Sequence, residues 1–423
     1  MSGVADDIRD AIWSFILAFA MESPLEQSPG MKKLPLLLRL GLPHFYSNIT
    51  VRMHRAPFDL YLLLKKHPYL STNVRNIFGS RSCYDLSLAD WKLVAEGKRI
   101  DRADVQATLI KKLALRPPPT PETLLLSTVY VFAQLRNLTT LKLIPTTTGP
   151  EDRYHCGEEF ALPWLAIVAL AGCAGASLRQ MSARISAEDS DAPVDIFEAF
   201  TRFTALEKLT WKSDLRCTGV TVDGFILPRL RELEVMKADK SFFETLSTAG
   251  IVNLRSLSLN KGLEFTFQQF LSSHGPTLSR IEVPIDVAHA VSSRLLDLCP
   301  NLEFLRIWWS WVDGANAVPD ARIFLPGSPA LLMKHIQFDI DLDRHHRVAE
   351  RWADVLHGLP AAMPNLEEVR LTGMHWPTTE REIAKSEWVR AAVVLLESGV
   401  SMVDGAGRKW RGRLKIGGSK QKA

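Results

Sequence analysis

Carboxylates at calcium-ligand spacing are the first residues whose chemistry needs weighing. Asp339 begins an alternating run of three aspartates, and Glu350 follows at the twelfth position of a calcium-binding loop. The sixth position holds Arg344, where such a loop needs glycine for its sharp turn. Asp339 also continues an alternating apolar pattern, which is typical of a strand. We therefore interpret these aspartates as solvated residues at the end of a strand and expect no metal site.

Sequence motifs of common catalytic sites are missing from the chain. It has no P-loop, no G-x-S-x-G nucleophile motif, no H-E-x-x-H zinc motif and no G-x-G-x-x-G dinucleotide motif. The five cysteines are scattered and form no C-x-x-C pair, so neither a disulfide framework nor a cysteine zinc site is predicted. We expect a protein that is not an enzyme and that needs no cofactor.

A row of residues suited to a protein interface is the remaining candidate site. Phe304, Arg306 and Trp308 alternate with two aliphatic residues, so a strand would direct the two sets to opposite faces. Aromatic residues and arginine dominate the energetics of protein interfaces. We predict a partner-binding surface here, whereas the tryptophans at positions 309 and 311 are expected to fill the interior. The other predicted members of the surface are Arg280, Glu282, His335 and Gln337.

The elements that position this row follow from an internal repeat. The leucines Leu206, Leu230, Leu254, Leu278 and Leu302 are separated by four successive steps of 24 residues. Each begins a pattern of apolar residues, L-x-x-L-x-L, whose last two members alternate as they would on one face of a strand. Helical patterns lie between these segments. One strand and one helix per 24 residues cannot close a core alone, but stacked copies can.

Looser copies of the repeat flank the regular block. Their anchors are Leu138 before it, and Met333 and Leu366 after it. The array resembles a leucine-rich-repeat protein over roughly residues 70–375. The predicted fold class is therefore α/β, a solenoid with a parallel sheet on its concave side and helices on its convex side. An ordinary α/β domain with evenly spaced strands is the alternative.

The C-terminal region is predicted to close the array and then to become disordered. A helical pattern over 382–398 would cover the last repeat. Residues 408–423 hold seven Lys and Arg and no acid, which fits a nuclear-localisation segment or a solubilising tail. Without them the chain has 44 cations against 47 anions. A general nucleic-acid binder would need an excess of cations, so we expect no nucleic-acid partner.

The apolar run Ala11–Met21 is too short to cross a membrane, which takes about 20 residues. Acidic residues precede it where a signal peptide would be basic. We therefore expect a chain of the cytoplasm or nucleus, without a membrane partner.

The N-terminal sequence resembles an F-box. The motif runs through Asp6-Asp7-Ile8 and continues as Ile12-x-Ser14-Phe15-Ile16, with Val4-Ala5 in the place of Leu-Pro. Residues 45–77 are similar to the passage that joins F-box and repeats in fungal F-box proteins. The resemblance implies a small all-helical unit that binds a Skp-family adaptor of a cullin–RING ubiquitin ligase. The residues implied in adaptor binding are Asp7, Ile8, Ile12, Phe15 and Ile16.

The predicted organisation has four parts. They are an F-box-like segment at 1–50, a linking strand, helix and first irregular repeats at 51–120, the repeat array with its capping helix at 121–403, and a basic disordered tail at 404–423. The resemblance implies a substrate-recognition adaptor of an SCF-type ligase whose repeats bind an unknown protein target. Two alternatives stay open: the N-terminal helices only seal the first repeat, or the repeats are a scaffold without a ligase.

Overall fold

The structure, a computed structural model, describes a large part of the chain. The described residues are 46–51, 60–62, 64–65, 68–79, 121–144, 161–186, 192–219, 225–260, 267–291, 294–309, 318–324, 327, 329–339 and 349–411. They form two compact units. The N-unit comprises Met1–Val220 with Ile226–Pro228, and the C-unit comprises Thr221–Phe225 with Arg229–Ala423.

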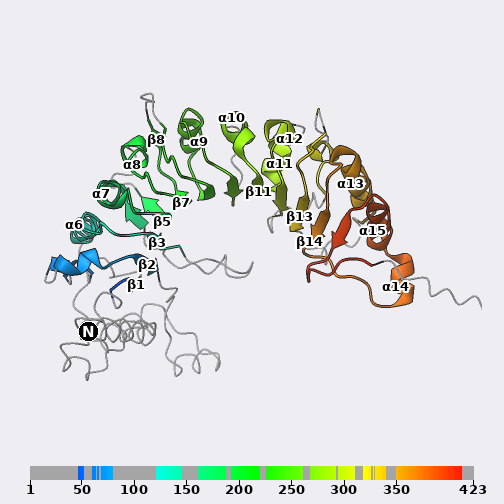
Figure 1. Cartoon of the computed structure of the whole chain (residues 1–423), viewed down its shortest axis with the longest axis horizontal. Coiled ribbons are helices and arrows are strands. Elements are labelled where there is room, and N and C mark those ends of the chain that lie inside the picture. The colour runs from blue at the N-terminus through cyan, green and yellow to red at the C-terminus, as the bar shows by residue number, and fades with distance from the viewer. Residues whose placement is uncertain are drawn as a thin grey trace, which may run out of the picture. The chain divides into compact units, whose positions relative to one another are not determined.

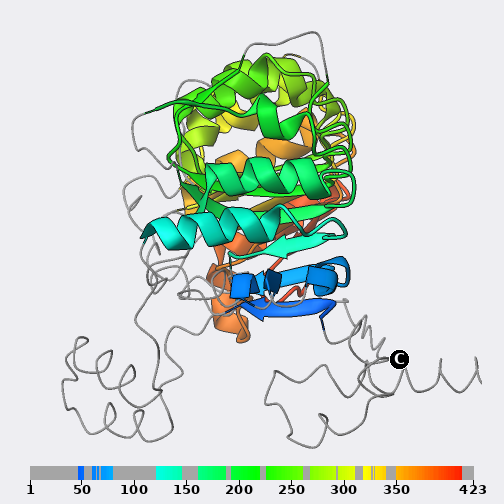
Figure 2. The ribbon, with the colours of Figure 1, turned by 90° about the vertical axis from the view of Figure 1, so that its left-hand side faces the viewer.

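The N-unit contains a parallel sheet whose strands follow one another nearly in chain order, β1-β2-β3-β5-β7, with β4 beside β5. Figure 2 shows its first strands, blue and cyan, one above the other. The strands are β1 (Asn48–Val51), β2 (Asn76–Gly79), β3 (Thr140–Lys142), β4 (Ala161–Pro163), β5 (Gln180–Ser186) and β7 (Lys208–Ser213), and β6 (Val194–Asp195) pairs separately with β8 (Cys217–Thr218). The helices are η2 (Pro68–Thr72), α6 (Pro121–Phe132), α7 (Trp164–Ala174) and α8 (Phe197–Phe200).

The C-unit repeats the same arrangement with strands in strict chain order, β9 to β15, all parallel (Figure 1). The strands are β9 (Glu232–Lys237), β10 (Ser256–Leu259), β11 (Arg280–Pro284), β12 (Phe304–Trp308), β13 (His335–Asp339), β14 (Glu368–Leu371) and β15 (Ser401–Val403). The helices are α9 (Lys240–Ser247), α10 (Phe267–His274), η4 (Gly275–Thr277), α11 (Ile285–Val291), α12 (Leu295–Leu298), η6 (Ala321–Phe324), α13 (Ala349–Ala362), α14 (Glu380–Lys385) and α15 (Glu387–Glu397). The predicted α/β class with a parallel sheet and helices is confirmed.

The 24-residue step of the sequence is the register of the sheet. Leu257 lies opposite Leu233 on one side and Ile281 on the other, and Ile281 lies opposite Leu305. These residues are buried, as is the anchor Leu254. Each step therefore places an equivalent side chain in the same layer of the core, which explains why the 24-residue spacing repeats along the block.

A repeated backbone contact joins successive strands at their N-terminal ends. The carbonyl oxygen of Arg255 accepts from the N–H groups of Ser279 and Arg280, at 2.9 and 3.0 Å. The carbonyl of Ser279 accepts in the same way from the N–H groups of Glu303 and Phe304 in the next repeat. Asn301 adds a side-chain bond, because its Nδ2 donates to the Pro276 carbonyl at 2.7 Å. These contacts fix one repeat against the next before the strands begin.

Helix starts differ in part from the sequence prediction. The N-cap of α9 is Asp239, whose carboxylate accepts from the Ser241 N–H at 3.0 Å. The predicted helix over 382–398 is two helices, α14 and α15, because the backbone of Ser386 is extended and its side chain caps α15. Val394 of α15 is 39% exposed.

The C-terminal segment corrects the prediction of a disordered tail that begins at 404. Residues 404–411 form a turn after β15, and Val403 pairs with Lys409. The fully buried Asp404 accepts from Arg408 N–H and Nε, both at 2.8 Å. Trp410 packs against Trp376, with ring centroids 5.0 Å apart. Residues 412–423 lie outside the described residues.

The predicted boundary at residue 50 also needs correction. It falls inside β1, which pairs with β2 over its four residues.

A membrane-spanning helix is absent from the described residues, since none of their helices has the length and apolar character that crossing requires.

Candidate interaction surface

The sequence-predicted partner-binding residues lie on three adjacent strands of the C-unit. The register of β11, β12 and β13 arranges them in three rows across the sheet. We call this surface the Arg306 face. Its rows are Arg280, Phe304 and His335; Glu282, Arg306 and Gln337; and Pro284, Trp308 and Asp339.

Burial confirms the direction predicted for the side chains of β12. Leu305 and Ile307 are fully buried, whereas Phe304, Arg306 and Trp308 are partly exposed. The helices of the C-unit lie along the other side of its strands (Figure 1). The Arg306 face is therefore the side of the sheet that the helices leave open. That a partner binds there stays a prediction.

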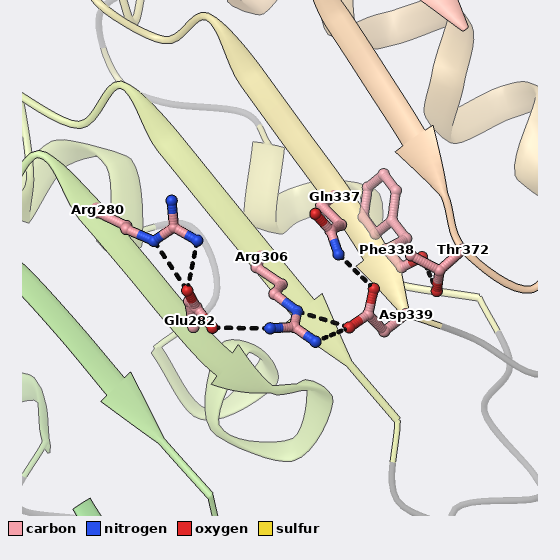
Figure 3. A network of polar contacts seen from close by, with 7 residues as sticks. All are labelled: Arg280, Glu282, Arg306, Gln337, Phe338, Asp339 and Thr372. Atoms are coloured by element: carbon pink, nitrogen blue, oxygen red, sulfur yellow. Dashed lines mark hydrogen bonds and ion pairs between the residues drawn. The ribbon is translucent and has the colours of Figure 1, made fainter. Parts of the chain in front are cut away.

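Arg306 is held between carboxylates from the two neighbouring strands (Figure 3). Its Nε donates to Asp339 Oδ2 at 2.6 Å, and its Nη2 contacts the same oxygen. On the other side its Nη1 donates to Glu282 Oε2 at 3.0 Å. Gln337 donates to the second oxygen of Asp339 at 2.8 Å. The guanidinium is thus fixed across three strands.

Electrostatics at Arg306 favour its charged form. Burial alone would lower the pKa of this guanidinium, but Asp339 and then Glu282 outweigh burial, and the pKa is raised above its ordinary value. Because the side chain is only 31% exposed, its ion pairs are shielded from part of the screening that weakens surface pairs. The charge is therefore a permanent feature of the face.

Arg280 forms the second half of the network. Its Nε and Nη2 both contact Glu282 Oε1, at 2.8 and 2.7 Å. Its guanidinium carbon also lies 3.8 Å from the centroid of the Phe304 ring, which is a cation–π contact. Glu282 therefore links the two arginines, and one of them already lies against an aromatic ring.

Trp309 packs against the interior but is only half-buried, so the prediction that it fills the interior is met in part. Its ring centroid lies 5.8 Å from Trp352 and 6.2 Å from Phe338. Trp352 and Phe338 are fully buried. Trp311 lies outside the described residues.

Asp339 was not among the predicted partner-binding residues. Period two places it on the same face as His335 and Gln337, where a solvated carboxylate at the end of the strand was expected. Its carboxylate is instead the main partner of Arg306, which strand alternation alone does not indicate. The remainder of the rejected calcium pattern, residues 340–348, lies outside the described residues.

The residues implied in adaptor binding cannot be placed. Asp7, Ile8, Ile12, Phe15 and Ile16 lie outside the described residues.

Comparison with known proteins identifies no family for this chain. No protein-family model matches the chain, and no curated protein matches it. Among solved structures, the leucine-rich-repeat-containing protein LegL7 from Legionella pneumophila matches with 11% sequence identity, over 86% of this chain and 92% of that chain, at a TM-score of 0.35. A likeness at this level carries no weight for function.

Proposed function

We propose that this chain is a substrate-recognition adaptor of an SCF-type cullin–RING ubiquitin ligase, of the fungal F-box/leucine-rich-repeat type. In this proposal the repeats are those of a leucine-rich-repeat solenoid, and a protein target binds on the Arg306 face. The F-box-like segment at 1–50 binds the Skp-family adaptor. The chain itself does no chemistry, and it accelerates ubiquitin transfer by holding the target near the enzyme.

The observation that carries the binding role is the open Arg306 face. An aromatic–arginine–aromatic row lies on a strand that is paired on both sides, so its backbone is fixed. Ion pairs from both neighbouring strands fix the central side chain as well. A surface that is already ordered loses little conformational entropy when a partner binds. Its residue types are those found at the centres of protein interfaces.

The ligase role is supported by the F-box resemblance of Asp7, Ile8, Ile12, Phe15 and Ile16. An apolar helix face of this kind would bind a groove on the adaptor.

Affinity purification of the full-length protein, followed by mass spectrometry, tests both roles together. We expect the wild type to recover a Skp-family adaptor and a cullin. The double variant I12D/F15D should lose the adaptor and keep the target, because only the N-terminal face is changed. The double variant R306A/W308A should lose the target and keep the adaptor. A wild type that recovers neither adaptor nor cullin would contradict the ligase role.

A truncation must respect the fold. Deletion of residues 1–45 removes the F-box-like segment and keeps β1, whereas deletion of 1–50 would cut that strand. If the shorter deletion unfolds the repeats, the N-terminal helices are a cap for the first repeat.

The second candidate function is a repeat scaffold that binds a protein partner without a ligase. The Arg306 face supports it equally, since this face says nothing of the adaptor. Recovery of a target without adaptor or cullin would favour it.

A further inference from the structure

The charges of the Arg306 face are balanced within the face itself. The guanidiniums of Arg280 and Arg306 contact the carboxylates of Glu282 and Asp339, so the formal charges of these four groups cancel. The arginine side chains are 46% and 31% exposed, but the carboxylates are only 16% and 19% exposed. A partner would therefore contact guanidinium groups whose charge is already compensated by these less exposed carboxylates.

Arg306 keeps few donors for a partner. A guanidinium has five N–H groups, and three nitrogens of Arg306 already contact Asp339 or Glu282. An incoming carboxylate or phosphate that bound the remaining N–H groups would lie close to the two carboxylates that already contact Arg306. Like charges at such a separation repel each other. A neutral acceptor, such as a backbone carbonyl, avoids that cost.

Two aromatic residues flank Arg306 in the sequence of β12 and share its face. Phe304 and Trp308 are each two residues from Arg306 on the same face, so their Cα atoms are about 13 Å apart. The Arg280 guanidinium already lies against the Phe304 ring at 3.8 Å. The Arg306 side chain is itself 31% exposed, and guanidinium groups stack well on aromatic rings.

We propose that the Arg306 face selects an aromatic side chain in a target segment of low net charge and discriminates against acidic or phosphorylated segments. This inference rests on the proposed function, in which the target binds this face. Glu282 and Asp339 are positioning residues, because they hold the Arg306 guanidinium across the strands and cancel its charge. Phe304, Arg306 and Trp308 are the residues that touch the partner.

An array of immobilised nonapeptides, probed with the full-length protein, tests this selection. Each peptide has one fixed central residue in a randomised sequence, and the fixed residues are Tyr, Trp, Lys, Glu and phosphoserine. We expect the strongest binding to the Tyr and Trp sets, with a change of less than about twofold between about 50 and 300 mM NaCl, because the face is internally neutral. R306A should weaken this binding about tenfold.

Arg370 provides the matched control. It lies on the same side of the sheet and pairs with Glu368 at 3.0 Å, and its own strand places no aromatic residue beside it. R370A should therefore leave the selection of Tyr and Trp peptides unchanged. Equal losses in R306A and R370A would contradict a site centred on Arg306.

The double variant E282Q/D339N tests the role of charge compensation. It keeps the size of both side chains and their capacity to accept hydrogen bonds, but it leaves Arg280 and Arg306 uncompensated. We expect a gain of about tenfold in binding to Glu and phosphoserine peptides relative to the wild type. Thermal unfolding of each variant checks that the fold is retained, and the single variant E282Q repeats the test with a smaller change.

The outcomes separate this inference from the proposed function. A wild type that prefers Glu or phosphoserine peptides, with that preference lost in R306A, would overturn the partner class and leave the Arg306 face as the docking surface. Binding that is the same for wild type and R306A across the whole array would overturn both. Aromatic selection that depends on Arg306 supports both.

Discussion

In both units the residues that alternate with the core residues of the strands share one backbone pattern, but their charges differ. In the C-unit each arginine of this face contacts a carboxylate of the same face. Among the described strand positions of the N-unit face, no acidic side chain occurs. The cationic residues there are Lys142, Arg184, Lys208 and Lys212, of which Lys208 and Lys212 have further contacts.

The difference teaches that strand position alone does not define the role of an arginine. Arg184 and Arg306 each alternate with buried apolar residues on a parallel strand. Arg184 is exposed, and it has no ion pair within the described residues. Arg306 is held by two carboxylates, so it is a fixed part of the surface. We therefore expect the two residues to respond very differently to substitution.

The largest expected effect is the loss of stability when an anchor leucine is truncated, and it should be similar in the two units. Leu138 of the N-unit and Leu254 of the C-unit are equivalent anchors, and both are fully buried. L138A and L254A should each reduce the free energy of unfolding by about 2–5 kcal/mol, because each leaves a cavity in a packed layer. Urea unfolding followed by circular dichroism measures both. A loss below about 1 kcal/mol in either variant would show that its anchor is not part of a packed core.

The next largest effect should fall on the C-unit face. R306A leaves Glu282 and Asp339 without their shared cation, and we expect it to lower the free energy of unfolding by about 1–2 kcal/mol, a value reduced for partial exposure. E282Q/D339N in the R306A background should restore part of this loss. A R306A variant as stable as the wild type would indicate that the network contributes only to binding.

A smaller effect concerns pH and the interior of the C-unit. His274 is buried, with Nε2 2.9 Å from the Leu246 carbonyl oxygen, and burial lowers its pKa below the ordinary 6.5 despite that bond. The folded state therefore binds this proton less readily than the unfolded state. Above about pH 6.5 His274 is neutral in both states and the folded state keeps its full stability. As the pH falls below this value, the unfolded state binds the proton first, and the free energy of unfolding decreases.

Thermal unfolding of wild type and H274Q across this pH range measures the contribution. We expect the wild type to lose stability more steeply than H274Q on acidification. His289 also has a lowered pKa, through burial, and serves as the second variant to examine. Parallel curves for wild type and H274Q would assign the acid sensitivity to other groups.

The smallest effect is expected on the N-unit face. R184A removes an exposed side chain without an ion pair in the described part of the chain, so stability should change by no more than about 0.5 kcal/mol. The measurement is the same urea titration used for R306A. A loss in R184A as large as that in R306A would remove the distinction between the two faces.

The sequence was informative wherever a spacing repeated. The 24-residue step predicted which leucines are buried, because one step returns the chain to the same layer of the core. It also predicted the direction of Phe304, Arg306 and Trp308, since a strand has period two. A further signal was present but unused: asparagine precedes the anchor leucine at 301 and 365, and both side chains bond to the preceding repeat.

Contacts between particular side chains could not be predicted. The anchors Leu302 and Met333 are 31 residues apart, and Phe304 lies opposite His335 at the same step, but this register does not show which carboxylate an arginine contacts. The break at Ser386 interrupts a continuous helical pattern, and a single capping hydroxyl is a weak signal beside that pattern. The folded turn at 404–411 includes the packing of Trp410 on Trp376, and these two residues are far apart in the sequence.

The most direct test of the proposed function is calorimetric titration of the full-length protein with a purified Skp-family adaptor. We expect one-to-one binding by the wild type and by R306A/W308A, and no binding by I12D/F15D. That result would assign the N-terminal segment to the adaptor and leave the Arg306 face for a target. A folded wild type that shows no heat of binding would contradict the ligase role.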